Sequence, residues 1–383
     1  MPWSGSVEDQ RLLFLGEFLA AGANRRRVCD WWGVSPKTAY KWLKRYEAAG
    51  EEGLSDRSRR PRSSPGRTSE TIAAQVLAVR EAYPAWGGRK IEAVLKRRGV
   101  AGVPAPSTIT EILRRGGQLG AVRERPVSVG RFARARPNEL WQMDFKGHFR
   151  LRNGRRCHPL LIIDDHSRHC MAARACENER GETVRAELER VFREYGLPEE
   201  MLMDNGAPWG NDAVHVYTPF VTWLIRLMIH ITHGRPRHPQ TQGKTERLNR
   251  TVGEEYLALQ TEGFAENPEV QVGMDRWRTT YNEERPHEAL EMAVPASRYR
   301  PSERAMPDRL PAIEYEAGDI VRKVQDGGRI GFGGREWRLP KAFRGLPVAL
   351  RPMEEDGKVS AYFCQQRIAE LDLRTGKVQV VRG

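Results

Sequence analysis

Three acidic residues lie where short strands and a helix would bring oxygen ligands together. Asp144 sits inside the apolar run LWQMDF, Asp204 ends the run MLMD, and Glu246 follows HPQTQGKT at the start of a helical pattern. A charge in a buried strand is costly unless a cation or another partner compensates it. Three hard oxygen donors suit Mg²⁺, for which Mn²⁺ can substitute. The pattern predicts a phosphoryl-transfer site with two metal ions, roughly 3.5–4 Å apart, held by these carboxylates.

Other residues near these acids have more than one interpretation. The chain contains 50 acidic residues, so three acids alone are a weak signal, and Asp164-Asp165 compete as metal ligands. We interpret that pair as structural, because its strand continues into HSR rather than ending at a turn. His238 could titrate near a phosphate, or it could be an incidental loop residue. Trp209 could stack on a base, but we interpret it as a packing residue.

The loop before Glu246 is rich in groups that bind nucleic acid. Amide and ammonium side chains hold phosphate oxygens or bases, and basic side chains beside the metal ions would neutralise DNA charge. The candidate DNA contacts in this segment are Gln240, Gln242, Lys244 and Arg247.

The elements that would position the three acids form a mixed α/β pattern over residues 138–265. The strands are LWQMDF, HPLLIIDD, HCMAARAC, MLMD and MIHIT, with helices at 180–195 and 212–228 and another that begins near Glu246. A helical extension is predicted for residues 266–310. Residues 311–383 switch to short strands around glycine-rich turns, which predicts a small C-terminal β-barrel.

Charge is unevenly distributed along the chain. The formal net charge is +13, and residues 1–135 hold 25 Lys and Arg against 13 Asp and Glu. This concentration indicates a polyanion partner, usually DNA or RNA, with a solubility face as the alternative. The five cysteines never form a CxxC spacing, which argues against a disulfide framework or a zinc site. With no apolar run of 18 residues and no secretory signal, we expect a cytoplasmic protein without a membrane partner, nucleoid-associated when bound to DNA.

Residues 1–54 have the pattern of a helix-turn-helix domain. A first helical pattern ends at Gly22, a second short helix ends at Gly33, and Ser35-Pro36 begin a third helix. The third helix has an apolar face and a basic face, as a recognition helix does. An ordinary three-helix bundle with a solvated basic face is the alternative. The candidate DNA contacts are Lys37, Thr38, Tyr40, Lys41, Lys44 and Arg45.

Two basic connections flank a second helical unit. Residues 55–68 are a linker whose arginines would lie in a minor groove or along phosphates, or would form only a charged spacer. Residues 69–120 predict a second helix-turn-helix or winged-helix domain, and residues 121–137 a further linker. The candidate DNA contacts are Arg57, Arg59, Arg60 and Arg62 in the first linker and Arg89 and Lys90 in the second domain.

Longer motifs resemble those of the integrase-like DDE transposases of bacterial insertion sequences, relatives of retroviral integrases. The matching segments are WQMD, LLIIDDHSR, LPEEMLMDNGAPWG, HGRPRHPQTQGKTERLNRT and RWRTTYNEERPHEAL with Pro295 and Tyr299. The resemblance covers residues 135–300 in detail, the N-terminal helical units more loosely, and the C-terminal segment only by position. It implies an RNase H-like core in which Asp144, Asp204 and Glu246 are the catalytic DDE triad.

The sequence departs from this family pattern in two ways. Forty-one residues separate Asp204 from Glu246, a few more than is common in the superfamily, and we place the surplus in APWGNDAVHVYTPF. No His/Cys zinc module precedes the core, unlike in retroviral integrases.

The activity that the resemblance implies is that of a DNA transposase. Such an enzyme binds the terminal inverted repeats of a mobile element, cleaves phosphodiesters to free 3′-hydroxyl ends and joins these ends to target DNA. Two ends must be held together, so we expect a homodimer or a larger assembly on double-stranded DNA. The alternatives are a DNA-binding regulator with a non-catalytic RNase H-like scaffold and a structure-selective nuclease of the same fold. A nuclease would release its products and never link a new 3′ end to a second duplex.

Overall fold

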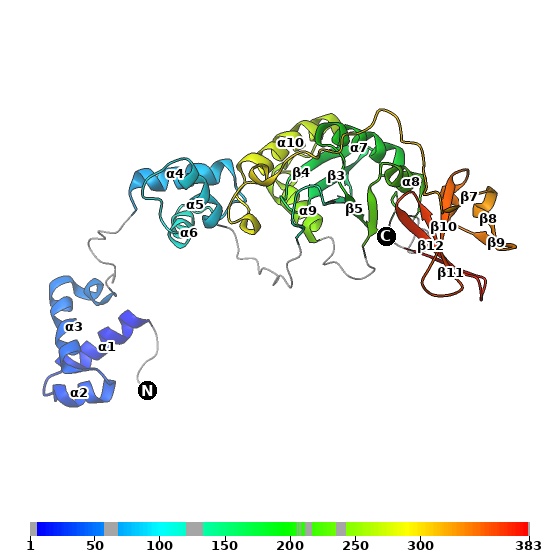
Figure 1. Cartoon of the computed structure of the whole chain (residues 1–383). Helices are drawn as coiled ribbons and strands as arrows, with labels where there is room; N and C mark the ends of the chain where they lie inside the picture. The colour runs from blue at the N-terminus through cyan, green and yellow to red at the C-terminus, as the bar shows by residue number, and fades with distance from the viewer. Residues whose placement is uncertain are drawn as a thin grey trace. The chain divides into compact units, whose positions relative to one another are not determined.

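The computed structural model divides the chain into two compact units, Met1–Arg67 and Thr68–Gly383 (Figure 1). Within them the structure describes residues 6–56, 68–119, 133–204, 206, 208–210, 217–234 and 243–381. Among the described helices, none is both long enough and apolar enough to cross a membrane.

The first unit is a three-helix domain. Its elements are α1 (Val7–Leu19), α2 (Arg25–Trp32), α3 (Pro36–Ala49) and the short helix η1 (Gly50–Leu54). Gly33 ends α2 in the left-handed region, with φ 63°, and the Ser35 hydroxyl caps α3 by accepting from the Thr38 amide. Phe14, Phe18 and other apolar side chains form its core. The predicted helix-turn-helix is confirmed.

The second unit begins with another three-helix domain, α4 (Glu70–Ala82), α5 (Gly88–Arg97) and α6 (Pro106–Arg115). Helices α5 and α6 cross closely at Gly88, where a Cβ atom would lie 2.4 Å from the Pro106 carbonyl oxygen. Residues 68–119 contain no strand, so this part of the chain forms a helix-turn-helix without a wing.

A mixed sheet with its helices follows. Its elements are β1 (Leu140–Phe145), β2 (Phe149–Arg150), β3 (Arg156–Asp164), β4 (Cys170–Cys176), α7 (Gly181–Tyr195), β5 (Glu200–Met203), α8 (Pro219–Arg226), β6 (His230–His233) and α9 (Gly243–Glu255). Helix α8 begins at Pro219 after the cap Thr218, later than the predicted start at residue 212, and residues 211–216 lie outside the described part of the chain.

The main strands of this sheet lie in the order β4-β3-β1-β5-β6, and β2 pairs with β3 beyond the end of β1. Strands β1, β3 and β4 are antiparallel, whereas β5 and β6 run parallel to β1. Alternate residues of β3 face opposite sides: Leu160 and Ile162 pack with α7 and α8, while Leu161 and Ile163 pack with α9 and α10. This is the integrase-like RNase H fold that the sequence predicted.

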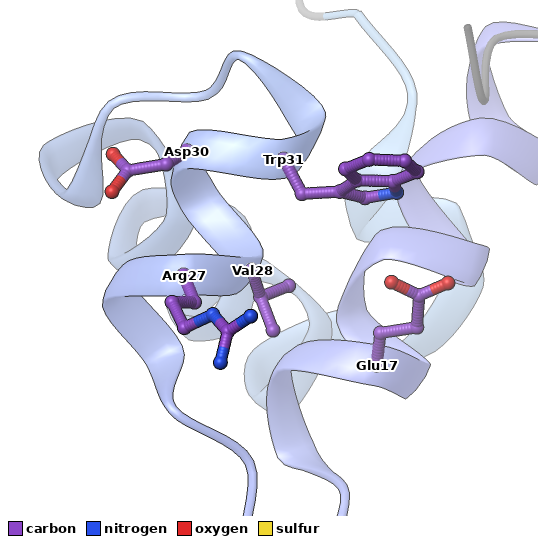
Figure 2. Close-up of a pocket in the computed structure, with 5 residues that line it drawn as sticks. All are labelled: Glu17, Arg27, Val28, Asp30 and Trp31. Atoms are coloured by element: carbon purple, nitrogen blue, oxygen red, sulfur yellow. The ribbon is translucent and has the colours of Figure 1, made fainter.

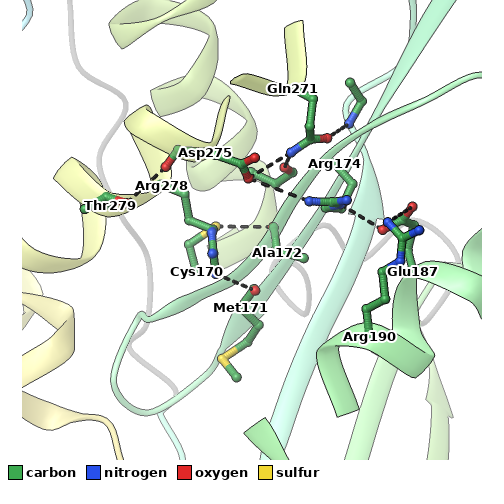
Figure 3. Close-up of polar contacts among 12 residues, drawn as sticks. Cys170, Met171, Ala172, Arg174, Glu187, Arg190, Gln271, Asp275, Arg278 and Thr279 are labelled. Atoms are coloured by element: carbon green, nitrogen blue, oxygen red, sulfur yellow. Dashed lines mark hydrogen bonds and ion pairs between the residues drawn. The ribbon is translucent and has the colours of Figure 1, made fainter. Parts of the chain in front are cut away.

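Short helices and one longer helix follow the sheet. They are η3 (Leu257–Leu259), α10 (Asn267–Thr279), η4 (Thr280–Glu284), η5 (Glu288–Leu290) and η6 (Pro295–Arg298), of which all but η3 lie within 266–310, the predicted helical extension. A polar cluster attaches α10 to β4, and it also joins β4 to α7 (Figure 3). Arg174 of β4 lies 2.8 Å from Glu187 of α7 and 3.7 Å from Asp275 of α10, and Arg278 donates to the Met171 carbonyl. These bonds brace the antiparallel side of the sheet.

The C-terminal segment forms β7 (Ile320–Lys323), η7 (Asp326–Gly328), β8 (Arg329–Phe332), β9 (Arg335–Arg338), η8 (Lys341–Phe343), β10 (Pro347–Pro352), β11 (Lys358–Phe363), β12 (Gln366–Asp372) and β13 (Lys377–Val380). Five of the strands pair in the order β13-β12-β11-β10-β7, and β8 pairs only with β9. No pairing closes this sheet within the described residues, so the predicted barrel is not confirmed. The buried Gln366 amide bonds to both the amide and the carbonyl of Ile231 in β6, at 2.9 and 3.0 Å.

Candidate active site and DNA-binding residues

The sheet brings two of the predicted acids to one edge. Strands β1 and β5 are parallel neighbours, and their register pairs Leu140 with Glu200 and Gln142 with Leu202. Continued by two residues, the same offset places Asp144 level with Asp204. The carboxyl ends of parallel strands in an α/β sheet are where ligands usually bind.

Helix α9 carries the third acid toward Asp144. Its buried residues Leu248 and Val252 pack on β3 in the same cluster as Leu161, which fixes the face that the helix turns to the sheet. The Asn249 amide Nδ2 donates to Asp144 Oδ2 at 2.8 Å, while the Glu246 side chain is exposed.

The electrostatics connect the three acids. The pKa of Asp144 is raised to about 6, first by burial and then by the charges of Asp204 and Glu246, and the Asn249 hydrogen bond opposes the shift. A partly buried carboxylate repelled by two others is an environment that a divalent cation would relieve. The buried Asn249 Oδ1 also has no hydrogen-bond partner among the described residues. The donor set therefore fits a hard cation, although the described residues hold no cluster of three or more acids, histidines or cysteines close enough to bind one as they stand.

The turn after β5 fixes Asp204. Its carboxylate accepts the Gly206 amide at 3.0 Å, and its carbonyl is 3.0 Å from His233 Nδ1 of β6. A Cβ atom on Gly206 would lie 3.2 Å from Asp204 Oδ2, so a larger residue would crowd the carboxylate.

The competing pair, Asp164 and Asp165, is fully buried and saturated with protein donors. Asp164 accepts the Asn138 amide, the Ser167 amide and the Ser167 hydroxyl at 2.6–2.7 Å. Asp165 accepts the Arg134 amide, Gln142 Nε2 and the Lys244 ammonium. These contacts agree with the structural interpretation of the pair.

The other candidate residues near the acids differ in burial and in their partners. Trp209 is buried and stacks on Phe145 with ring centroids 5.6 Å apart, so it packs. Arg247 is exposed on α9. Lys244 is paired with Asp165, and burial lowers its pKa to about 8 although Asp165 opposes that shift. His238, Gln240 and Gln242 lie outside the described residues.

The DNA-contact candidates within residues 1–54 all lie on α3. Lys37, Tyr40, Lys41 and Lys44 are exposed, Thr38 and Arg45 are partly so, and Thr38 is 2.9 Å from the Ser35 hydroxyl. A hollow elsewhere in this unit, between α1 and α2, is lined by Glu17, Arg27, Val28, Asp30 and Trp31 (Figure 2). It contains none of the predicted contacts, and its two acids do not suit a polyanion. Arg57, Arg59, Arg60 and Arg62 lie outside the described residues.

The two candidates in the second helical domain face acidic residues of the extension and of α9. Lys90 lies 3.4 Å from Glu255, which also accepts Arg285 Nε at 2.8 Å, and burial lowers the pKa of Lys90 to about 8. Arg89 is exposed and 3.6 Å from Glu288. A phosphate contact by Lys90 would have to compete with its part-buried ion pair with Glu255, which the sequence did not reveal. The DNA contacts of Arg89 and Lys90 stay predictions.

Family comparisons match most of the chain in separate pieces. The integrase core domain matches residues 134–239 and, in a second form, 227–295, and the C-terminal domain of IS481 family transposases matches residues 319–379. A helix-turn-helix domain matches residues 10–62 and a homeodomain-like domain residues 38–113.

The chain is also similar to individual proteins from an insertion element and from viruses. The insertion element IS407 uncharacterized 31.7 kDa protein of Burkholderia multivorans is 26% identical over 259 residues, which are 66% of this chain and 88% of that protein. The HTLV-2 integrase catalytic core domain in complex with magnesium is 16% identical, with a TM-score of 0.34 over 43% of this chain and 99% of that one. A chain of a simian T-cell lymphotropic virus intasome in complex with PP2A regulatory subunit B56 gamma is 17% identical, with a TM-score of 0.37 over 76% of this chain and 97% of that one.

Integrase core domains thus match residues 134–295, the transposase domain matches residues 319–379, and helix-turn-helix domains precede them. The chain is similar to the integrase-like transposases of insertion sequences.

Proposed function

We propose that this protein cleaves phosphodiesters at the ends of a mobile element to free 3′-hydroxyl groups, and then joins those ends to target DNA. The observation that carries the proposal is the geometry of an integrase core in which the β1–β5 register places Asp144 level with Asp204 and Asn249 of α9 bonds to Asp144. Burial and the charges of Asp204 and Glu246, which raise the pKa of Asp144, support it. Acids that repel one another in this way are typical of a site built for a cation.

Asp144, Asp204 and Glu246 would hold Mg²⁺, or Mn²⁺ in its place, with two ions in each site. When bound, the two ions would stabilise charge on the attacking and leaving oxygens of the phosphodiester. Asn249 holds one oxygen of Asp144 by its 2.8 Å hydrogen bond, and the Gly206 amide holds one oxygen of Asp204. Because the pKa of Asp144 is about 6, that carboxylate is mostly ionised at pH 7.5 and ready to receive a cation.

Two helical domains, 1–54 and 69–120, would read the terminal repeats together with the linkers 55–68 and 121–137. Residues 138–265 would form the catalytic domain. The extension 266–310 and the C-terminal domain 311–383 complete the chain. Exposed basic side chains on α3, such as Lys37 and Lys41, would meet base edges and phosphates. Two ends would be held by two or more copies of the chain.

The test incubates the full chain with Mg²⁺ and duplexes carrying the native terminal repeat, a scrambled repeat and a target plasmid. We expect nicks at the repeat boundary, joined products in which the new 3′ end is linked to the plasmid, and neither product in EDTA. Nicks without joining would identify a nuclease, and specific binding without either product would identify a regulator.

A further inference from the structure

We propose that Asp165 is a positioning residue for Glu246, acting through Gln142 and Lys244 to hold the first turn of α9 against β1. The proposal rests on the function proposed above, because it assigns Glu246 to the metal site. It also changes the role of Lys244 from a DNA contact to a tether.

Asp165 lies just beyond the end of β3 and is fully buried. Its Oδ1 accepts both Gln142 Nε2, at 2.9 Å, and the Lys244 ammonium, while Oδ2 accepts the Arg134 amide at 2.8 Å. One carboxylate therefore joins β1, the segment before β1 and the start of α9. Breaking a buried ion pair leaves an uncompensated buried charge, so loss of the Asp165–Lys244 pair would be strongly destabilising.

Gln142 forms the second branch of the network. It lies two residues before Asp144, and residues two apart in a strand project from the same face. Its buried Oε1 accepts both the backbone amide and the hydroxyl of Thr245, each at 3.4 Å. The first amides of a helix lack partners within it, so this side chain supplies one for α9.

The two branches end on the two residues that directly precede Glu246. Thr245 is fully buried and Lys244 is largely so, whereas Glu246 itself is exposed. The next strong apolar anchor of α9 is Leu248, which is 1% exposed. Glu246 thus depends on the Asp165 network for its position on one side and on Leu248 for its position on the other.

The test compares Asp165→Asn with Asp164→Asn in the full chain. Asp164 is an adjacent, equally buried acid whose described partners, Asn138 and Ser167, are not on α9. Four quantities are measured: the Mg²⁺ concentration for half-maximal strand joining, kcat, KM for end DNA, and hydrogen exchange of amides 243–250 without metal. Lys244→Arg, Lys244→Gln and Gln142→Met complete the set.

We expect Asp165→Asn to raise the half-maximal Mg²⁺ concentration roughly ten-fold or more, as is typical when a group that orients a metal ligand is lost. Its kcat should fall while KM for DNA stays within about two-fold, and amides 243–250 should exchange faster. Gln142→Met should change the same quantities in the same direction by less, and it provides the test if Asp165→Asn does not fold. Lys244→Arg, which keeps the positive charge, should change these quantities less than Lys244→Gln, and Asp164→Asn should leave the Mg²⁺ requirement unchanged.

Unchanged Mg²⁺ dependence and exchange in Asp165→Asn, together with a raised KM for DNA in Lys244→Gln, would overturn the proposal and return Lys244 to DNA binding. Absence of Mg²⁺-dependent products from the wild type would instead refute the proposed function. In that case the exchange of amides 243–250 would still show whether Asp165 holds α9.

Discussion

Two acidic sites on neighbouring strands of the same sheet have opposite environments. Asp144 of β1 is partly buried, accepts a side-chain hydrogen bond from Asn249, and has a pKa raised to about 6 by burial and by two other acids. Asp164 of β3 is fully buried, and although burial raises its pKa, three donors from Ser167 and Asn138 oppose that shift. Burial of a carboxylate is therefore not enough to mark a functional site. What distinguishes Asp144 is that two other acids raise its pKa, whereas Asp164 is surrounded by donors.

The largest effect on activity is expected when the carboxylates that repel one another are removed. Asp144→Asn, Asp204→Asn and Glu246→Gln should each reduce cleavage and joining by about 1,000-fold or more, since metal ions supply several kcal/mol of transition-state stabilisation. Binding to end DNA should change by less than about two-fold in gel-shift titrations. Glu254→Gln, on the same helix and also exposed, is the matched control and should keep full activity. Substantial Mg²⁺-dependent activity in any one of the three variants would refute the triad.

The second prediction concerns the saturated site. Asp164→Asn should destabilise the fold by about 2–3 kcal/mol, because an amide NH₂ group would face donors of Ser167 or Asn138 in a buried position. Urea unfolding of the full chain with and without Mg²⁺ measures the loss. A variant as stable as wild type would show that Asp164 is not the structural acid of the pair.

The third prediction is that Asp144→Asn, unlike Asp164→Asn, stabilises the fold. The folded-state pKa of Asp144 is raised above its ordinary 3.8 to about 6, so its ionisation penalises folding increasingly as pH rises from about 4, and fully above about 6. Asp144→Asn should therefore stabilise the metal-free protein at pH 7.5 by on the order of 1–2 kcal/mol and leave it little changed at pH 4. Melting curves at the two pH values decide this, and destabilisation at pH 7.5 would contradict it.

The smallest predicted effect is a competition between protons and metal. Since the proton on Asp144 must leave before a cation binds, the half-maximal Mg²⁺ concentration should rise about four-fold from pH 7.5 to pH 5.5 for a pKa near 6. Mg²⁺ titrations of joining activity, with end binding measured in parallel, give this ratio. A ratio near one would mean that Asp144 does not share the cation.

The sequence predicted the elements of the core well because their signals are local. The apolar run that contains Asp144, the run that ends in Asp204 and the turn at Gly206 identify the strands without knowledge of their partners. The hydrogen bonds around these acids could not be predicted, because they depend on register and helix rotation. Asn249 is 105 residues from Asp144, and Thr245 is 103 residues from Gln142.

Two other predictions depended on equally distant contacts. Lys90 was predicted to be a DNA contact because it lies on a basic helical domain, and its ion pair with Glu255, 165 residues away, could not be predicted. The strands of the C-terminal domain were predicted from alternation and turns, whereas closure into a barrel depends on which edges meet. Local pattern defines strands, and it does not define their neighbours.

The side chain of Gln366 has a consequence for the edge of the catalytic sheet. An edge strand presents unpaired amides and carbonyls that can recruit a strand from another molecule. By bonding to both backbone groups of Ile231, Gln366 imitates the backbone of one further strand and blocks that edge of β6. A shortened chain that ended before residue 311 would keep the three acids but expose this edge. Its failure would then appear as aggregation during purification rather than as a defect in chemistry.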